Sequence, residues 1–453
     1  MLRHGITRPV LLAIGVAAAV VTGACGDSGT DSGRLPAGPA CVKSEADGRC
    51  LPLAPTGDRV DLDKPEFSHP TAVTNPLHPT SKVAQTLYGG RADGEPFRAE
   101  VTLLPGSKTI TWNGERIDAV ISQYVAYQDG RIAEVALDWY AQADDGSVWY
   151  LGEDVFNYED GVVADKEGTW QAGKDGTAAM IMPAEPEVGD AYRPENIPGT
   201  VFEEVSVKAV DQTVPGPNGP VKGAITVEEI HQDSAREEKI FAPGYGEFST
   251  GTGQGDLEAV TLAVPTDAVG GPVPAELTRI SGAADRVFDT AGTGDWSGAS
   301  AAAATAQRAR DTFRSGDVPA ALGDQLSDAV DAMNAAVTAR DADDARQSAL
   351  RAAQADLDLQ LRHRPPADID AARLALWARQ LLVDTAAEDH GAVAGDVATL
   401  ERIWDRVGHT ADKDPASRVE NRLRELRQAA DDRDLTAVAE SVPALRSAWS
   451  TLR

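Results

Sequence analysis

Apolar and polar residues alternate between regularly spaced turns in the first half of the chain. Asn-Gly or Asp-Gly pairs begin at residues 113, 129, 145, 160 and 175, at spacings of 15 or 16 residues. These pairs favour the positive φ values of tight hairpin turns. Between two of them, the apolar residues Val135, Leu137 and Trp139 alternate with acidic residues at 134 and 138. Such alternation is typical of antiparallel strands with one buried face. Further strands are predicted at 203–210, 224–231, 239–242 and 257–264.

The second half has a different period, because its apolar residues recur every three or four positions. The clearest stripe contains Leu435, Val438, Val442, Leu445 and Trp449, which all lie on one side of a helix. Two more stripes begin near residues 374 and 393. We therefore predict an α+β multidomain protein. A curved antiparallel β-sheet or partly closed barrel is followed by an antiparallel α-helical bundle of six or seven helices.

Residue usage places the boundaries between these parts. All eight tyrosines lie between Tyr88 and Tyr245, and a Gly- and Pro-rich stretch follows at 265–274. Glycine and proline interrupt both helices and strands. The predicted domains are an antiparallel β domain at 59–264, a linker at 265–280 and the helical bundle at 281–453.

The N-terminus has the features of an export signal. Arg3 and Arg8 precede an apolar run at 10–21, and Cys25 follows a Gly-Ala pair. This order is typical of a secretory signal peptide, here 1–24, and twelve apolar residues are too few to span a bilayer. The Gly-Ala-Cys sequence resembles the lipobox of bacterial membrane lipoproteins, although Thr22 stands where that pattern usually has an aliphatic residue. The resemblance implies a diacylglyceryl group on Cys25 and a lipid-anchored protein on the extracytoplasmic face of the cell membrane. The alternative is an ordinary secretory signal.

The two other cysteines are Cys41 and Cys50. In an exported chain, an even pair this close in sequence predicts a small disulfide loop. A thiolate metal site is the alternative, but no histidine or further cysteine lies close by in the sequence. The surrounding stretch is rich in Gly, Ser, Pro and Asp, so residues 25–58 are predicted to be a flexible tether.

The net charge of the chain limits the kinds of partner that it can bind. The 453 residues include 42 Lys and Arg against 71 Asp and Glu, a formal net charge of -29. Nucleic acid is therefore an improbable partner, since phosphate binding needs clustered basic residues. No cofactor is predicted. A metal site in the helical half would need His390 and His409 to meet beside carboxylates such as Asp389, Glu401 or Asp405.

The sequence contains no nucleophile motif and offers no catalytic residue. Its most distinctive aromatic residues are Trp139, Trp149 and Tyr150, on neighbouring predicted strands. They are candidates for lining an apolar ligand site, and the alternative is that they form the core. Together with motifs near residues 181–190 and 241–248, they give residues 67–264 a resemblance to an uncharacterised β module of bacterial exported proteins. That module is similar to the curved-sheet folds of periplasmic lipoprotein carriers.

These observations predict a membrane-anchored lipoprotein of the cell envelope. Its expected role is non-catalytic binding of an apolar ligand or an envelope protein outside the cytoplasmic membrane. One alternative is an envelope hydrolase, which would need a polar cleft holding a histidine or carboxylate with a strongly shifted pKa. A second alternative is metal capture by the helical domain.

Overall fold

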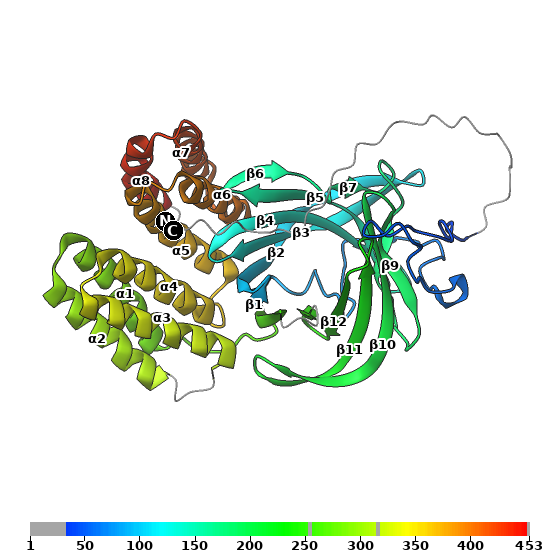
Figure 1. Cartoon of the computed structure of the whole chain (residues 1–453), viewed down its shortest axis with the longest axis horizontal. Helices are drawn as coiled ribbons and strands as arrows, with labels where there is room; N and C mark the ends of the chain where they lie inside the picture. The colour runs from blue at the N-terminus through cyan, green and yellow to red at the C-terminus, as the bar shows by residue number, and fades with distance from the viewer. Residues whose placement is uncertain (1–32, 252–255, 314–317, 451–453) are drawn as a thin grey trace.

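The chain forms a long antiparallel β-sheet followed by a set of α-helices, which confirms the predicted fold class (Figure 1). The computed structural model describes residues 33–251, 256–313 and 318–450. Among these residues, no helix combines the length and the apolar character that crossing a bilayer requires.

Within the described part of the chain, the sheet contains fourteen strands and does not close into a barrel. Its order is β6-β5-β4-β3-β2-β1-β14-β13-β12-β11-β10-β9, with β7 and β8 also paired to β5. The strands are β1 (Gln85–Ala92), β2 (Glu95–Trp112), β3 (Glu115–Gln128), β4 (Arg131–Gln142), β5 (Val148–Glu159), β6 (Val162–Asp165), β7 (Trp170–Gln171), β8 (Ala179–Met182), β9 (Ala191–Ile197), β10 (Val201–Gly216), β11 (Gly219–His231), β12 (Arg236–Ala242), β13 (Gly246–Gly251) and β14 (Leu257–Val264).

Three of the five Asn-Gly and Asp-Gly pairs form tight hairpin turns between consecutive strands. Asn113, Asp129 and Asp160 have φ values of 50°, 48° and 49°, and the glycine after each is also at positive φ. Those values are the ones that a two-residue hairpin turn needs. The pair at 145–146 lies in a longer loop between β4 and β5. The pair at 175–176 instead lies between the short strands β7 and β8, so its predicted role as a hairpin turn between long strands is wrong.

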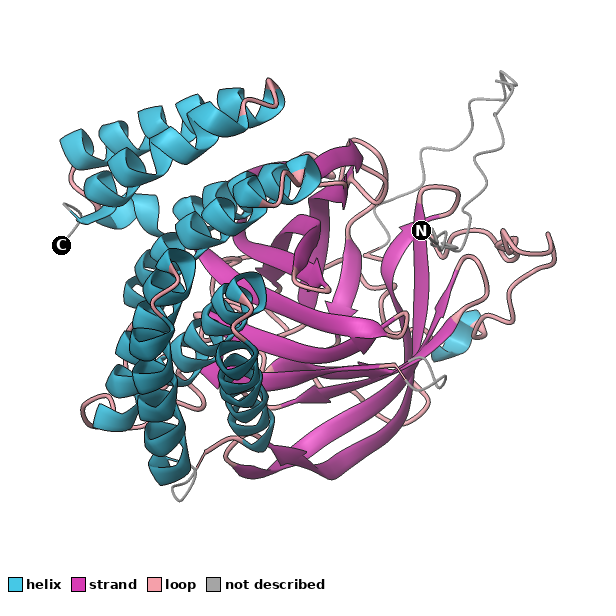
Figure 2. Ribbon diagram, turned by 60° about the vertical axis from the view of Figure 1, so that its left-hand side comes forward, coloured by secondary structure: helices cyan, strands magenta, loops and turns pink. Residues whose placement is uncertain are grey.

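The sheet bends strongly, so that its two arms face each other (Figures 1 and 2). One arm contains β1–β6 and the other β9–β12. Buried aromatic side chains from both arms belong to one apolar cluster, including Trp112, Trp149, Trp170, Tyr192 and Phe241. We call the surface inside this bend the concave face.

The helical part contains eight helices in the described residues, against the six or seven predicted. They are α1 (Ala275–Thr293), α2 (Trp296–Phe313), α3 (Ala320–Ala339), α4 (Ala342–Gln360), α5 (Pro366–Ala386), α6 (His390–Val407), α7 (Lys413–Asp431) and α8 (Leu435–Ser450). The predicted linker at 265–280 is too long, because the last six of its residues belong to the first helix. Leu277 and Ile280 are fully buried there, and that burial stabilises the helix start.

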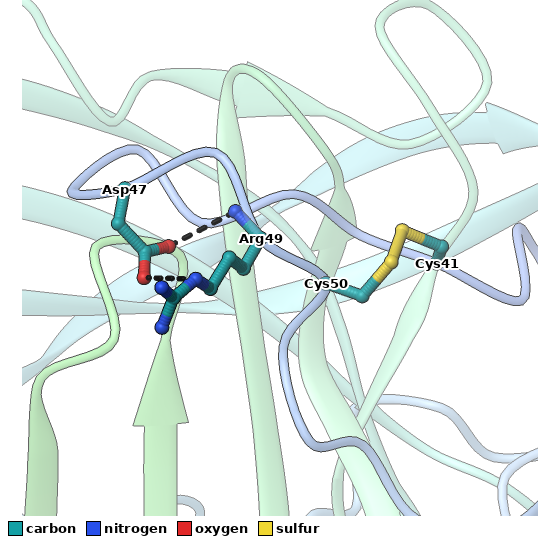
Figure 3. The surroundings of a disulfide bond; sticks show 4 residues. All are labelled: Cys41, Asp47, Arg49 and Cys50. Carbon is teal, nitrogen blue, oxygen red and sulfur yellow. Dashed lines mark hydrogen bonds and ion pairs between the residues drawn. A yellow bond between two sulfur atoms is a disulfide. The ribbon is translucent and has the colours of Figure 1, made fainter.

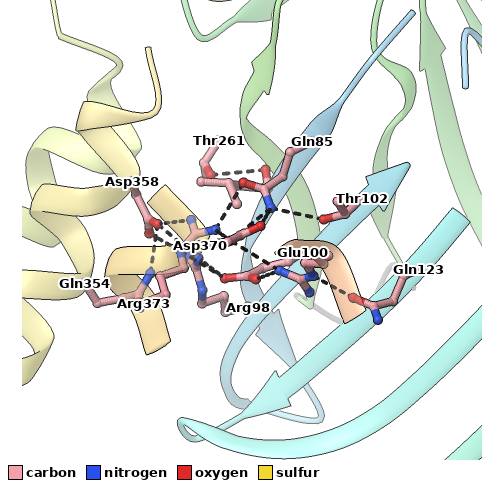
Figure 4. Close-up of polar contacts among 12 residues, drawn as sticks. Gln85, Arg98, Glu100, Thr102, Gln123, Thr261, Gln354, Asp358, Asp370 and Arg373 are labelled. Carbon is pink, nitrogen blue, oxygen red and sulfur yellow. Dashed lines mark hydrogen bonds and ion pairs between the residues drawn. The ribbon is translucent and has the colours of Figure 1, made fainter. Parts of the chain in front are cut away.

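Helices α5 and α6 pack on the side of β1–β4 that faces away from the bend (Figure 2). A buried group of charges joins the two parts, and we call it the interdomain network (Figure 4). Its charged members are Arg98, Glu100, Asp358, Asp370, Arg373 and Arg406. Glu100 on β2 lies beside all three arginines, and Arg373 on α5 bonds Asp358 and Asp370 at 2.7 Å each.

The described part of the predicted tether, residues 33–58, packs against the sheet and is not a free linker. Val42 and Leu51 are buried against Phe202 and Ile230 of β10 and β11. Cys41 and Cys50 are joined by a disulfide with a Cα–Cα distance of 5.1 Å (Figure 3). Burial of these two apolar side chains and the disulfide cross-link order the segment, although its composition is typical of a flexible linker. Its polar residues can remain in contact with water.

Candidate functional site

A cavity of about 220 Å³ opens inside the bend of the sheet. We call it the concave cavity. It is lined by strands of both parts of the sheet and by the segment before β1: His78, Pro79, Thr80, Val83, Thr86, Tyr88, Val101, Leu103, Ser122, Tyr124, Asp138, Tyr140, Ile181, Phe241, Tyr245, Gly246, Glu247 and Glu258. The volume is below the roughly 300–1,000 Å³ of sites for drug-sized ligands, so the cavity suits a small molecule.

Strand periodicity explains how the lining is assembled. Each of the strands β1 to β4 contributes two residues that are two positions apart, such as Ser122 with Tyr124 and Asp138 with Tyr140. Residues at that spacing lie on the same face of a strand. The register pairs Ser122 with Asp138, so the two side chains are neighbours across the sheet. The lining is therefore built on regular strands.

The cavity carries more negative than positive charge. Three lining residues are acidic, Asp138, Glu247 and Glu258, and none of the described lining residues is Lys or Arg. Burial lowers the pKa of the one histidine, His78, to about 4, so it is neutral at pH 7. Burial and the nearby charges of Glu247 and Glu237 raise the pKa of Glu258 to about 7. Burial likewise raises the pKa of Asp138 to about 7.

Aromatic rings enclose the acids, and hydrogen bonds hold those rings in place. The Tyr150 hydroxyl donates to Asp138 Oδ1 over 2.8 Å, and its ring stacks on Tyr140 with the centroids 4.8 Å apart. The Tyr88 hydroxyl donates to the main-chain oxygen of Glu247 over 2.9 Å. These contacts fix the lining side chains before any ligand arrives, which reduces the entropy lost on binding.

The predicted ligand residues lie beside this cavity but do not line it. Trp139, Trp149 and Tyr150 are 3%, 1% and 6% exposed and belong to the apolar core. Trp139 points to the opposite face of β4 from Asp138 and Tyr140, since successive side chains alternate. The structure thus places them in the core, the alternative given for them above, and their role in ligand binding stays a prediction. Tyr150 still supports the cavity through its bond to Asp138.

A second polar cluster continues along the concave face on β10–β12. The His231 ring lies 3.1 Å from Glu203 through Nδ1, and 3.3 Å from Glu229 through Nε2. Burial alone would lower the pKa of His231, but hydrogen bonds to Glu203 and Glu237, with the nearby carboxylate charges, raise it to about 11. Lys239 Nζ is 2.8 Å from Glu229. Two cations, His231 and Lys239, thus face three carboxylates, Glu203, Glu229 and Glu237.

The residue types of this cluster also suit a metal ion. Ligand atoms of Glu203, Glu229 and His231 lie within 4.8 Å of one another, the one such group among the described residues. A metal would have to displace the proton of His231 and the ammonium of Lys239, because metal binding requires a neutral imidazole. The contacts present therefore fit an ion-pair cluster better than a metal centre.

The remaining sequence candidates do not form a site. His390 begins α6 and His409 follows its end, so the whole helix of 18 residues separates them. At about 1.5 Å per residue the two rings are far too distant to share an ion. Cys25 lies outside the described residues.

No protein-family model matches the chain, and no curated protein is similar to it in sequence.

A larger cleft of about 930 Å³ is lined by residues of α1, α4, α5 and α8. Small side chains form much of its surface, among them Ala284, Ala349 and Ala375. Arg379 in this cleft is paired with Asp285.

Sequence reasoning missed the residues that do line the concave cavity. Asp138 was assigned to the polar side of a half-buried strand, and Glu258 was not singled out. The sequence feature that could have indicated the cavity is the occurrence of tyrosines and acids two positions apart on one strand, as in Asp138 and Tyr140. That pattern does not show which face of the strand is covered by the opposite arm of the sheet.

Proposed function

We propose that the protein is an exported, membrane-anchored lipoprotein of the cell envelope that binds a small ligand in the concave cavity. The role is non-catalytic, and the anchor is a lipid on Cys25 at the extracytoplasmic face of the cell membrane. The observation that carries the binding function is the pre-arranged lining, in which side chains from both parts of the sheet surround a space of about 220 Å³. The signal-like N-terminus supports the export and the anchor.

The anchor is tested by fractionation of cells that produce the full chain. The Cys25→Ser variant is expected to leave the membrane fraction, and intact mass is expected to show a diacylglyceryl group on the native chain only. Cys50→Ser is the matched control, because it removes the disulfide and keeps the lipid site. A native chain that carries no lipid would exclude the anchor.

The binding function is tested by native mass spectrometry of the chain purified from its own envelope. A retained small molecule is expected, and the Ser122→Met variant should lose it because the longer side chain enters the cavity. Ser107→Met makes the same change at an exposed position of β2 and should retain the ligand. An empty native chain, or equal retention by both variants, would contradict binding in this cavity.

An envelope hydrolase is the second candidate, because Asp138 and Glu258 have the pKa near 7 that general acid–base catalysis uses. This alternative expects turnover of envelope polymer fragments that Asp138→Asn abolishes. Glu238→Gln changes an exposed acid of β12 and should leave that turnover intact. A chain that retains its ligand unchanged would favour the binding role.

A further inference from the structure

We propose that the concave cavity recognises a small organic cation that carries an ammonium group. This inference rests on the proposed binding function, and it names the chemical class of the ligand.

The first support is uncompensated negative charge. Glu258 forms no ion pair within the described residues, and Asp138 bonds to a tyrosine hydroxyl, not to a cation. Glu247 has one cation nearby, Lys239 at 3.8 Å, but that ammonium lies closer to Glu229, at 2.8 Å. Burying carboxylates without cations is costly, and a bound cation would remove that cost.

The second support is the aromatic surface of the cavity. Its lining includes the rings of Tyr88, Tyr124, Tyr140, Phe241 and Tyr245. The face of an aromatic ring attracts cations, and the attraction is worth about 2 kcal/mol or more when the site is shielded from water. A cation in this cavity is therefore attracted both by the carboxylate charges and by the faces of the aromatic rings, whereas an anion is attracted by neither.

Three probes of the same shape test the charge preference on the full chain. They are tert-butylammonium, tert-butanol and pivalate, which carry a positive, a zero and a negative charge. Calorimetry at low ionic strength and pH 8 is expected to give a Kd for tert-butylammonium at least ten-fold lower than for tert-butanol, with no binding of pivalate. The Glu258→Gln variant should weaken the binding of tert-butylammonium at least five-fold.

Glu238→Gln is the matched control for that variant, since Glu238 is an exposed acid on β12 that does not line the cavity. Equal weakening by both variants would show attraction by overall charge and would overturn the inference. Equal affinity for the cation and the alcohol would also overturn it, while binding in the cavity would stand. Absence of binding by all three probes would exclude the cation, and the proposed function would then depend on the ligand retained by the native chain.

Discussion

The two faces of the sheet bury polar side chains in opposite ways. On the face toward the helices, the interdomain network sets Arg98, Arg373 and Arg406 against Glu100, Asp358 and Asp370 (Figure 4). On the other face, the concave cavity gathers Asp138, Glu247 and Glu258 with no arginine or lysine in its described lining. Positions next to each other in sequence, such as Glu100 and Val101, belong to different faces.

The pKa directions express this difference. Burial raises the pKa of Glu100, but the charges of Arg373, Arg406 and Arg98 outweigh it and hold that pKa well below its usual range. At Asp138 burial acts without a neighbouring cation, so the pKa rises to about 7. In the interdomain network the cations and carboxylates neutralise one another, and this network fixes the helices on the sheet. In the concave cavity the carboxylates have no matching cations until a ligand supplies positive charge.

The largest expected effect on stability comes from removing one charge from the interdomain network. Glu100→Gln leaves three arginines, of which Arg373 and Arg406 are buried, opposite two carboxylates. The loss of one partner of a buried ion pair costs about 3–5 kcal/mol. The free energy of unfolding, measured in denaturant at pH 7, should fall by that amount. Because the folded pKa of Glu100 is lowered, its contribution is present above the unfolded pKa of about 4.3 and declines as the pH falls below it.

The matched control is Glu95→Gln, an exposed glutamate on the same strand. Its effect should stay within about 0.5 kcal/mol, as is usual for surface positions. A loss at Glu100 no larger than this would show that the interdomain network does not hold the helices on the sheet.

Much of the fold was predictable because its signals are local. Asn113 and Asp129 fix hairpin turns through their own backbone preference, and the stripe of Leu435 and Val438 marks one side of α8. The start of α1 was missed although Leu277, Ile280 and Val287 stand at helical spacing, because the boundary was set by the Gly- and Pro-rich stretch just before them.

The candidate site was not predictable for a related reason. A half-buried strand was expected to direct Trp139 inward and Asp138 to solvent. Both faces of β4 are covered in the structure, so the tryptophan enters the core and the aspartate enters the cavity. The covering residues include Phe241 and Glu258, more than 100 positions further along the chain. Contacts between residues so far apart in the chain do not produce a periodic pattern in the sequence.

The second expected effect concerns the unbalanced face. The pKa of Asp138 is about 7 in the folded chain and about 3.9 when unfolded, so the folded state binds more protons between these values. Stability therefore falls as the pH rises from about 4 to 7. Asp138→Asn keeps the neutral shape and should be more stable than the native chain at pH 8, by about 1–3 kcal/mol, with little difference at pH 4.

Asp118→Asn is the control for that comparison, since Asp118 is exposed on β3. Denaturant unfolding at pH 4 and pH 8 should give the same pH dependence for this variant as for the native chain. A pH dependence of Asp138→Asn equal to that of the native chain would mean that a cation already compensates the carboxylate.

The smallest expected effect links the cavity charge to its ligand. Asp138 and Glu258 have pKa values of about 7, in a setting that also contains Glu134, Glu237 and Lys239. A bound ammonium favours the ionised carboxylates, so binding should release protons near pH 7. If one carboxyl must ionise, the Kd of tert-butylammonium should fall about ten-fold between pH 6 and pH 8, or about 1.4 kcal/mol.

Calorimetry in two buffers of different ionisation enthalpy measures the released protons directly. A Kd that stays constant over this range, with no proton release, would place the bound cation away from both carboxylates and remove the distinction between the two faces.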